Sequence, residues 1–159
     1  MDTHTDEEAD SAGRSDCRSV FENRVRFAET DLQGVVFYGE YFTFQDESVA
    51  AFLREIDYGY DRMHEDGWDI HVVNSELNYR EGAELGDVID NELCAPEIGT
   101  SSLMFTYRAR RRADGEILAD GTVTHVAVDR ETREPTRIPD AFRDAVATFG
   151  DGGGLESER

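Results

Sequence analysis

The stretch RFAETDLQGVVFYGEYF, residues 26–42, joins features that no single secondary-structure element explains. Residues 25–28 are typical of a strand, an acidic turn follows, and after Gly34 and two valines an aromatic-rich helix begins. Because aspartate is favoured in turns and near helix starts, Asp31 has two interpretations, a structural cap or a functional carboxylate. The sequence on either side of it decides between them.

An amphipathic helix is predicted over residues 38–56, where apolar residues recur at spacings of three and four. Its apolar face is wide and rich in aromatic rings, and it consists of Tyr41, Phe42, Phe44, Val49, Ala50, Phe52, Leu53 and Ile56. Aromatic residues at helical spacing are typical of a core. We therefore expect only one or two of the rings near the helix start to touch a ligand.

Downstream, the spacing of apolar residues changes from that of a helix to every second residue, as in a strand. Residues 103–110 and 117–127 alternate around the turn Ala113-Asp114-Gly115, which predicts a hairpin. Residues 69–81 and 86–98 alternate less regularly and predict a second pair of strands. A final short helix is expected over residues 139–149.

The lengths of these elements predict how they pack. Strands of roughly twelve residues span about 40 Å, and a helix of roughly nineteen residues spans about 28 Å, so one helix can lie along the sheet. One helix cannot cover both faces of a sheet, and an uncovered apolar face needs a partner. The sequence therefore predicts an α+β fold, a five-stranded antiparallel sheet wrapped around one long helix, in a homodimer or homotetramer.

The charge balance is strongly acidic, with 36 Asp plus Glu against 16 Lys plus Arg and a net charge of −20. All the basic residues are arginine. The self-repulsion of such a surface is screened at high salt, where the Debye length falls to about 3 Å at 1 M, which predicts a halophilic protein. A nucleic-acid partner needs a basic stripe and is not expected.

Two cysteines, Cys17 and Cys94, are too few and too differently placed to predict a disulfide. We expect free thiols in a reduced cytoplasm. The acidic start has no signal-peptide pattern and no long apolar run occurs, so membrane insertion is not expected. Residues 1–18 and 150–159 are predicted to be disordered tails around one folded domain, residues 19–149.

Residues 26–41 resemble the pattern R-x-x-D-T-D-x-x-G-V-V-[YF]-x-x-x-Y of 4-hydroxybenzoyl-CoA thioesterase-like proteins, which have the hotdog fold. The likeness extends through residues 100–103 to 135–139. It implies hydrolysis of an acyl-CoA thioester without a cofactor, since CoA is part of the substrate. Asp31 would attack the thioester or activate water, and a backbone N–H near Tyr38 would polarise its carbonyl. Gly34 would allow the thioester to approach the backbone.

Two positions depart from the family pattern. Tyr38 stands where one branch of the family, the Tol-Pal-associated enzymes, has a histidine, so no proton transfer by that histidine applies here. In the turn of residues 79–87, Gly82 replaces the family's proline, which affects the stiffness of the turn. Both departures leave Asp31 as the main catalytic group.

Other residues are candidates for holding the substrate. Arginine binds phosphate in bidentate fashion, so the arginines near residue 110 are candidates for the CoA phosphates, and serines are candidates for the pantetheine amides. Asp46 and Glu47 are rival catalysts, because some hotdog thioesterases carry their carboxylate within the helix. The predicted substrate contacts are Thr30, Gly34, Val35, Ser101, Ser102, Arg108, Arg110 and Arg137.

The histidines, at positions 4, 64, 71 and 125, lack zinc-binding spacing, and no metal is expected. Two alternatives to the hydrolase stay open. One is a hotdog hydratase or dehydratase, which needs a carboxylate and a histidine together in the site. The other is a non-catalytic module that binds acyl-CoA.

Overall fold

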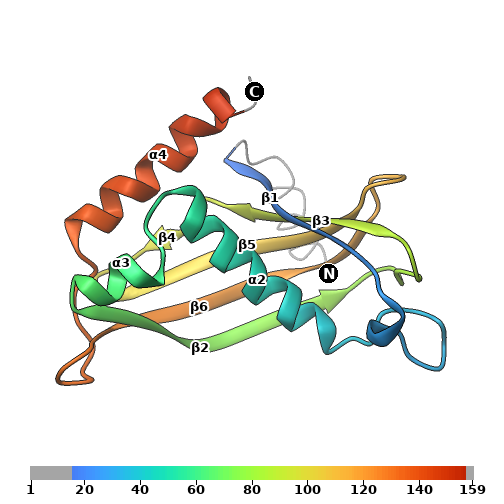
Figure 1. The fold of residues 1–159 in the computed structure, drawn as a ribbon, viewed down its shortest axis with the longest axis horizontal. Helices are drawn as coiled ribbons and strands as arrows, with labels where there is room; N and C mark the ends of the chain where they lie inside the picture. The colour runs from blue at the N-terminus through green and yellow to red at the C-terminus, as the bar shows by residue number, and fades with distance from the viewer. Residues whose placement is uncertain (1–15, 157–159) are drawn as a thin grey trace, which may run out of the picture.

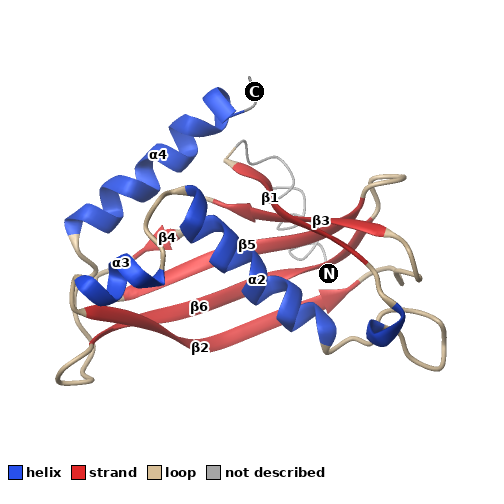
Figure 2. Cartoon of the chain, viewed as in Figure 1, coloured by secondary structure: helices blue, strands red, loops and turns tan. Residues whose placement is uncertain are grey.

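The computed structural model describes residues 16–156, with side chains described as far as residue 149. One long helix lies along one face of an antiparallel sheet (Figures 1 and 2). The strands are β1 (Cys17–Arg24), β2 (Trp68–Tyr79), β3 (Val88–Cys94), β4 (Glu97–Ile98), β5 (Ser102–Arg111) and β6 (Ile117–Asp129). The helices are the 3-10 helix η1 (Phe27–Glu29) and the α-helices α2 (Glu40–Glu55), α3 (Tyr60–Glu65) and α4 (Asp140–Glu156).

The sheet has the strand order β1-β3-β5-β6-β2, and the short strand β4 pairs with β5 as a sixth member. The five-stranded path agrees with the prediction, and β4 is the addition. The predicted hairpin is β5–β6, whose turn contains Gly115 at a φ of 77°. Strands β1 and β2 are the two ends of this path, so each pairs on one side only within the described chain.

The core lies between α2 and the sheet. Phe52 of α2 is fully buried, and its ring centroid lies 5.1 Å from that of Phe105 on β5 and 4.6 Å from that of Phe149 on α4. Burying one such side chain contributes about 1.5–3 kcal/mol relative to exposing it. Most of the apolar face predicted from the helical spacing therefore holds α2 against the sheet, but Phe42, which that prediction included, is 40% exposed.

Several boundaries differ from those predicted. Residues 25–28 do not form a strand, because β1 ends at Arg24 and the chain turns into η1, where the Glu29 carboxylate accepts the Arg26 N–H. The helix α3 was not predicted, since its six residues are too few to show a period.

Within the described chain, helix and strand also extend further into the two predicted tails than expected. β1 begins at Cys17, and α4 continues to Glu156, because adding a turn to an existing helix costs little. Residues 1–15 and 157–159 of the two predicted tails lie outside the described residues.

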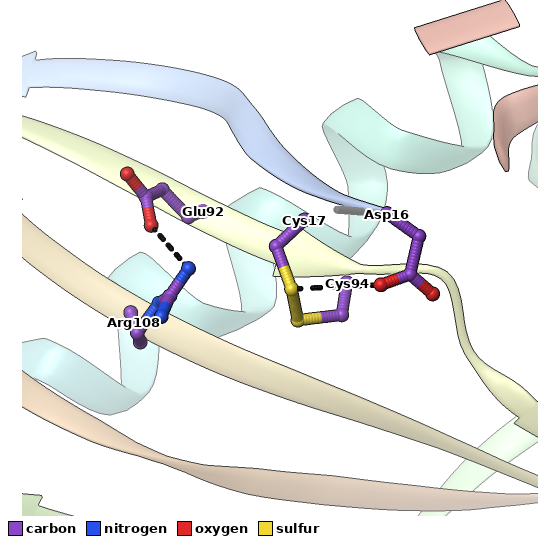
Figure 3. The surroundings of a disulfide bond; sticks show 5 residues. All are labelled: Asp16, Cys17, Glu92, Cys94 and Arg108. Carbon is purple, nitrogen blue, oxygen red and sulfur yellow. Dashed lines mark hydrogen bonds and ion pairs between the residues drawn. A yellow bond between two sulfur atoms is a disulfide. The ribbon is translucent and has the colours of Figure 1, made fainter. Parts of the chain in front are cut away.

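The expectation of two free thiols is wrong, because Cys17 and Cys94 form a disulfide (Figure 3). The two cysteines are 77 residues apart in sequence, yet the sheet order places β1 beside β3 with Cys17 opposite Cys94. Asp16 lies near both sulfur atoms, but the sulfurs are bonded to each other and are not thiolates for a metal ion. Among the described residues, no helix is long and apolar enough to cross a bilayer.

Candidate active site

Asp31 lies at the tip of a short hairpin, residues 30–36, that follows η1. Its N–H donates to the Val35 carbonyl and its carbonyl accepts the Gly34 N–H, both at 2.9 Å. Gly34 has a φ of 84°, and a Cβ there would meet nothing within 4 Å, so the backbone conformation, rather than space, requires glycine. The Asp31 Oδ1 accepts the Gln33 N–H at 2.9 Å, which is an Asx turn. One carboxylate oxygen is thus structural, and no residue in the described range hydrogen-bonds to the other.

The hairpin is docked against the turn between β2 and β3. The Val36 N–H donates to the Ala83 carbonyl at 2.8 Å, and Val35 forms a β-bridge with Glu84. A Cβ on Gly82 would come within 2.8 Å of the Val35 Cγ1. This contact explains the glycine at position 82, because a larger residue would push the hairpin away.

Glu29 clamps the base of the hairpin. Its side chain is 8% exposed and accepts the Arg26 N–H at 2.9 Å and the Arg26 guanidinium Nη2–H at 2.8 Å. Its carbonyl accepts the Phe37 N–H at 2.9 Å. Glu29 therefore fixes the chain on both sides of Asp31, and the Arg-x-x-Glu spacing is the signal that would have identified it.

We expect Glu29→Ala to lower kcat about tenfold, because the hairpin loses its buried acceptor and Asp31 loses its fixed position. We expect the fold of this variant to stay intact. Glu29→Gln keeps one acceptor oxygen, so its kcat should lie between that of Glu29→Ala and that of the wild type. Steady-state kinetics with thermal unfolding checks this. Equal kcat for all three proteins would show that the clamp has no effect on the site.

The start of α2 presents unused N–H donors beside this hairpin. The Tyr38 carbonyl accepts the Tyr79 hydroxyl at 3.2 Å and the Tyr41 N–H at 3.3 Å, which fixes the first turn. Within the described chain, no acceptor is hydrogen-bonded to the N–H groups of Tyr38 or Gly39. Free N–H groups at a helix start carry partial positive charge and can bind an oxyanion.

Aromatic rings surround the helix start. The Tyr38 ring centroid lies 4.7 Å from that of Phe37 and 5.9 Å from that of Tyr79, and all three rings are exposed. Tyr41 and Phe44 continue the cluster inward and are buried. The exposed rings form an apolar surface at the place where the helix offers its N–H groups.

Thr30 and Val35 keep the hairpin in shape. The Thr30 hydroxyl donates to the Phe27 carbonyl at 2.7 Å, so it is not directed at the Asp31 carboxylate. Val35 is half-buried against the turn that contains Gly82.

The predicted contacts to the phosphates and pantetheine of CoA lie at two ends of the sheet. Arg108 and Arg110 on β5 both form ion pairs with Glu92, at 3.1 Å each. Ser101 and Ser102 lie at the opposite end of β5, six to nine residues or about 20–30 Å away by strand geometry. Arg137, near Ser101 in the fold, forms an ion pair with Asp140 at 2.9 Å. Within one chain, Ser101, Ser102 and Arg137 are therefore not brought to Asp31.

A second polar cluster lies beneath α2 and was not predicted. The Ser75 hydroxyl on β2 donates to the Gln45 Oε1 of α2 at 2.7 Å, and His125 of β6 lies on the same covered face, edge-on to Phe105. Gln45 and His125 are each 2% exposed. The Gln45 Nε2 and the His125 Nδ1 have no hydrogen-bond partner among the residues described. Burial lowers the pKa of His125 to about 4, against a small opposite effect of Asp46.

His125 predicts a loss of stability in mild acid. Its folded-state pKa of about 4 lies below the ordinary 6.5, so the unfolded chain binds the proton more tightly. This contribution is complete above pH 6.5 and is lost as pH falls towards 4, by about 3 kcal/mol in the free energy of unfolding. Denaturant unfolding at pH 7 and pH 4 should show a smaller loss for His125→Gln than for the wild type. Equal losses would contradict the assignment.

Three comparisons place the chain among known proteins. Residues 25–146 match the thioesterase-like superfamily. Acyl-CoA thioesterase YbgC of Haemophilus influenzae is 26% identical over 75% of this chain and 87% of that protein. A 1,4-dihydroxy-2-naphthoyl-CoA hydrolase of Prochlorococcus marinus is 32% identical over 69% of this chain and 77% of the hydrolase. The crystal structure of Slr0204, a 1,4-dihydroxy-2-naphthoyl-CoA thioesterase from Synechocystis, shares the fold with a TM-score of 0.73 at 19% identity, covering 80% of this chain and 93% of that one.

Proposed function

The chain belongs to the thioesterase-like superfamily and is a thioesterase with the hotdog fold, and from this premise we propose that it hydrolyses acyl-CoA thioesters with Asp31 as the catalytic carboxylate. The observation that carries the proposal is the hydrogen-bonded hairpin, in which one Asp31 carboxylate oxygen has no hydrogen-bond partner among the described residues, seven residues before the free N–H of Tyr38 at the helix start. The products are a free carboxylic acid and CoA.

The reaction needs a nucleophile and a group that stabilises the oxyanion. Asp31 either attacks the thioester carbonyl, so that the C–S bond breaks, CoA leaves as the thiolate and water then cleaves the mixed anhydride, or it accepts a proton from water that attacks the carbonyl and displaces the CoA thiolate. The N–H of Tyr38 donates to the carbonyl oxygen as negative charge develops there. The Tyr38 side chain contributes an apolar surface rather than a proton.

The proposed binding of CoA uses two ends of the sheet. Arg110 and Arg108 lie at the end that carries Asp31, where a phosphate would compete with Glu92 for them. Arg137, Ser101 and Ser102 lie at the far end and would reach the substrate from a second copy of the chain. Thr30, Gly34 and Val35 would contact it through the hairpin backbone.

We propose that the protein works as a homodimer or homotetramer. Two features support this: β2 is an end strand of the sheet, and Val72 and Val73 on it are 52% and 59% exposed. Apolar residues on a strand whose outer edge is unpaired favour pairing of that edge with another strand. Light scattering at molar KCl measures the mass of the assembly, and a monomer would contradict the proposal.

We place this activity in the cytoplasm, where CoA thioesters are formed, and at high salt, because of the acidic surface. The test is release of a free thiol from a panel of aliphatic and aromatic acyl-CoAs in molar KCl. We expect turnover of at least one member. Tight binding of CoA esters without thiol release from any of them would replace the hydrolase with an acyl-CoA-binding module.

A further inference from the structure

Tyr79, the last residue of β2, holds the first turn of α2. Its hydroxyl donates to the Tyr38 carbonyl at 3.2 Å, and the same carbonyl accepts the Tyr41 N–H at 3.3 Å. The Tyr38 carbonyl and the Gly39 N–H belong to one peptide group, which is planar and trans. The hydroxyl therefore fixes the direction in which the Gly39 N–H points, and no acceptor within the described chain uses that N–H.

The Tyr79 side chain is itself held in place. Its ring centroid lies 5.9 Å from that of Tyr38 and 5.8 Å from that of Tyr41, which is buried. Its backbone belongs to the sheet, where Tyr79 pairs with Ala119 of β6. Partial burial raises the pKa of the Tyr79 hydroxyl, so it keeps its proton and can donate at neutral pH. A side chain that is fixed by a strand and by packing can hold a functional group in position.

The two free N–H groups of the helix start are held in different ways. The Tyr38 N–H belongs to the peptide whose carbonyl, that of Phe37, accepts the Glu40 N–H at 2.9 Å. The next peptide has a longer bond from the helix, because 3.3 Å from the Tyr41 N–H lies outside the usual range. The Tyr79 hydroxyl supplies the second bond to this peptide. Free N–H groups in the first turn of a helix point in one direction, so a single oxygen can accept from both.

We propose that Tyr79 is a positioning residue, whose hydroxyl orients the Tyr38–Gly39 peptide so that the Gly39 N–H donates to the thioester carbonyl oxygen beside the Tyr38 N–H. This inference rests on the proposed hydrolysis of acyl-CoA. A carbonyl that accepts hydrogen bonds is polarised, which makes the N–H of the same peptide a stronger donor. The effect grows as negative charge develops on the substrate oxygen, so Tyr79 acts on kcat more than on KM.

The first test is Tyr79→Phe, which removes the hydroxyl and keeps the ring. We expect kcat to fall about fivefold and KM to stay within about twofold of the wild-type value. Tyr58→Phe is the matched control, because the Tyr58 hydroxyl donates to Asp66 after α3, beyond the other end of α2, and it should keep wild-type kcat. A wild-type kcat in Tyr79→Phe, or a change in KM alone, would overturn the inference.

The second test uses Gly39→Ala and Gly39→Pro, which both add a Cβ that would meet the Phe37 Cε2 at 2.9 Å. Only proline also removes the N–H, and the φ of −65° at Gly39 is one that proline adopts. We expect kcat of Gly39→Pro to be about 10²-fold below that of Gly39→Ala. Adding Tyr79→Phe to Gly39→Pro should then have no further effect, whereas a merely structural hydroxyl would cost about fivefold in both backgrounds.

An infrared measurement decides the question if Gly39→Pro does not fold. The protein is Asp31→Asn, and the probe is the best acyl-CoA of the panel, labelled with a heavy isotope at the thioester carbonyl. Binding should lower the carbonyl stretching frequency, and adding Tyr79→Phe should reduce that shift. Equal shifts in the two proteins, or equal kcat in Gly39→Ala and Gly39→Pro, would overturn this inference alone. No thiol release by the wild type from any acyl-CoA would overturn the proposed function and this inference with it.

Discussion

Asp31→Asn is expected to lower kcat about 10³-fold on the best acyl-CoA substrate while the protein stays folded. Activity is lost because the substitution replaces the carboxylate with a neutral amide, which neither attacks a thioester nor accepts a proton from water. The fold should persist, since the asparagine Oδ1 can still accept the Gln33 N–H that closes the turn. Thiol release in molar KCl, with thermal unfolding of both proteins, measures the two effects separately.

Glu47→Gln is the matched control for Asp31→Asn, because Glu47 is an exposed carboxylate on α2 and one of the two rivals within the helix. It should keep wild-type kcat. Full activity in Asp31→Asn would remove Asp31 from the mechanism, and loss of activity in Glu47→Gln or Asp46→Asn would move the catalytic carboxylate into the helix.

The parts of the fold that the sequence predicted well are those with a strong local period. The helix expected over residues 38–56 is α2, Glu40–Glu55, because its wide apolar face repeats over four turns. The β5–β6 hairpin was predicted because Asp114-Gly115 fixes its turn. The first strand was expected at residues 25–28, whereas β1 is Cys17–Arg24. Its sequence, CRSVFENR, has no regular apolar alternation, because the strand lies at the end of the sheet and is half-buried on both faces.

The residues of the candidate site also fall into two groups, those that a local sequence pattern brings together and those that only the fold brings together. Asp31, Gly34 and the start of α2 at Glu40 lie within ten residues, so local pattern and resemblance were enough to propose them together. Gln45 and His125 are 80 positions apart and locally unremarkable, and each is buried only once the chain has folded. The Cys17–Cys94 pair was missed for the same reason, because its partners meet only through the strand order.

Reduction of the Cys17–Cys94 disulfide is expected to lower the free energy of unfolding by about 4 kcal/mol, because the bond closes a segment of 77 residues and its loss frees the unfolded chain. Catalysis should change little. Cys17 begins β1, and the Glu29 clamp follows the other end of that strand, eight residues or about 25 Å away. The disulfide thus supports the stability of the sheet rather than the geometry of Asp31.

Urea unfolding with and without dithiothreitol measures the stability effect, and kcat in the same two buffers measures the effect on the site. The double variant Cys17→Ser with Cys94→Ala should match the reduced wild type and show no response to dithiothreitol, which separates the bond from other actions of the reductant. Two titratable thiols per chain in the unfolded, unreduced protein would show that the cysteines are not paired. A parallel loss of kcat on reduction would mean instead that β1 transmits the constraint to the hairpin through Arg26 and Glu29, whose contacts begin two residues after the strand ends.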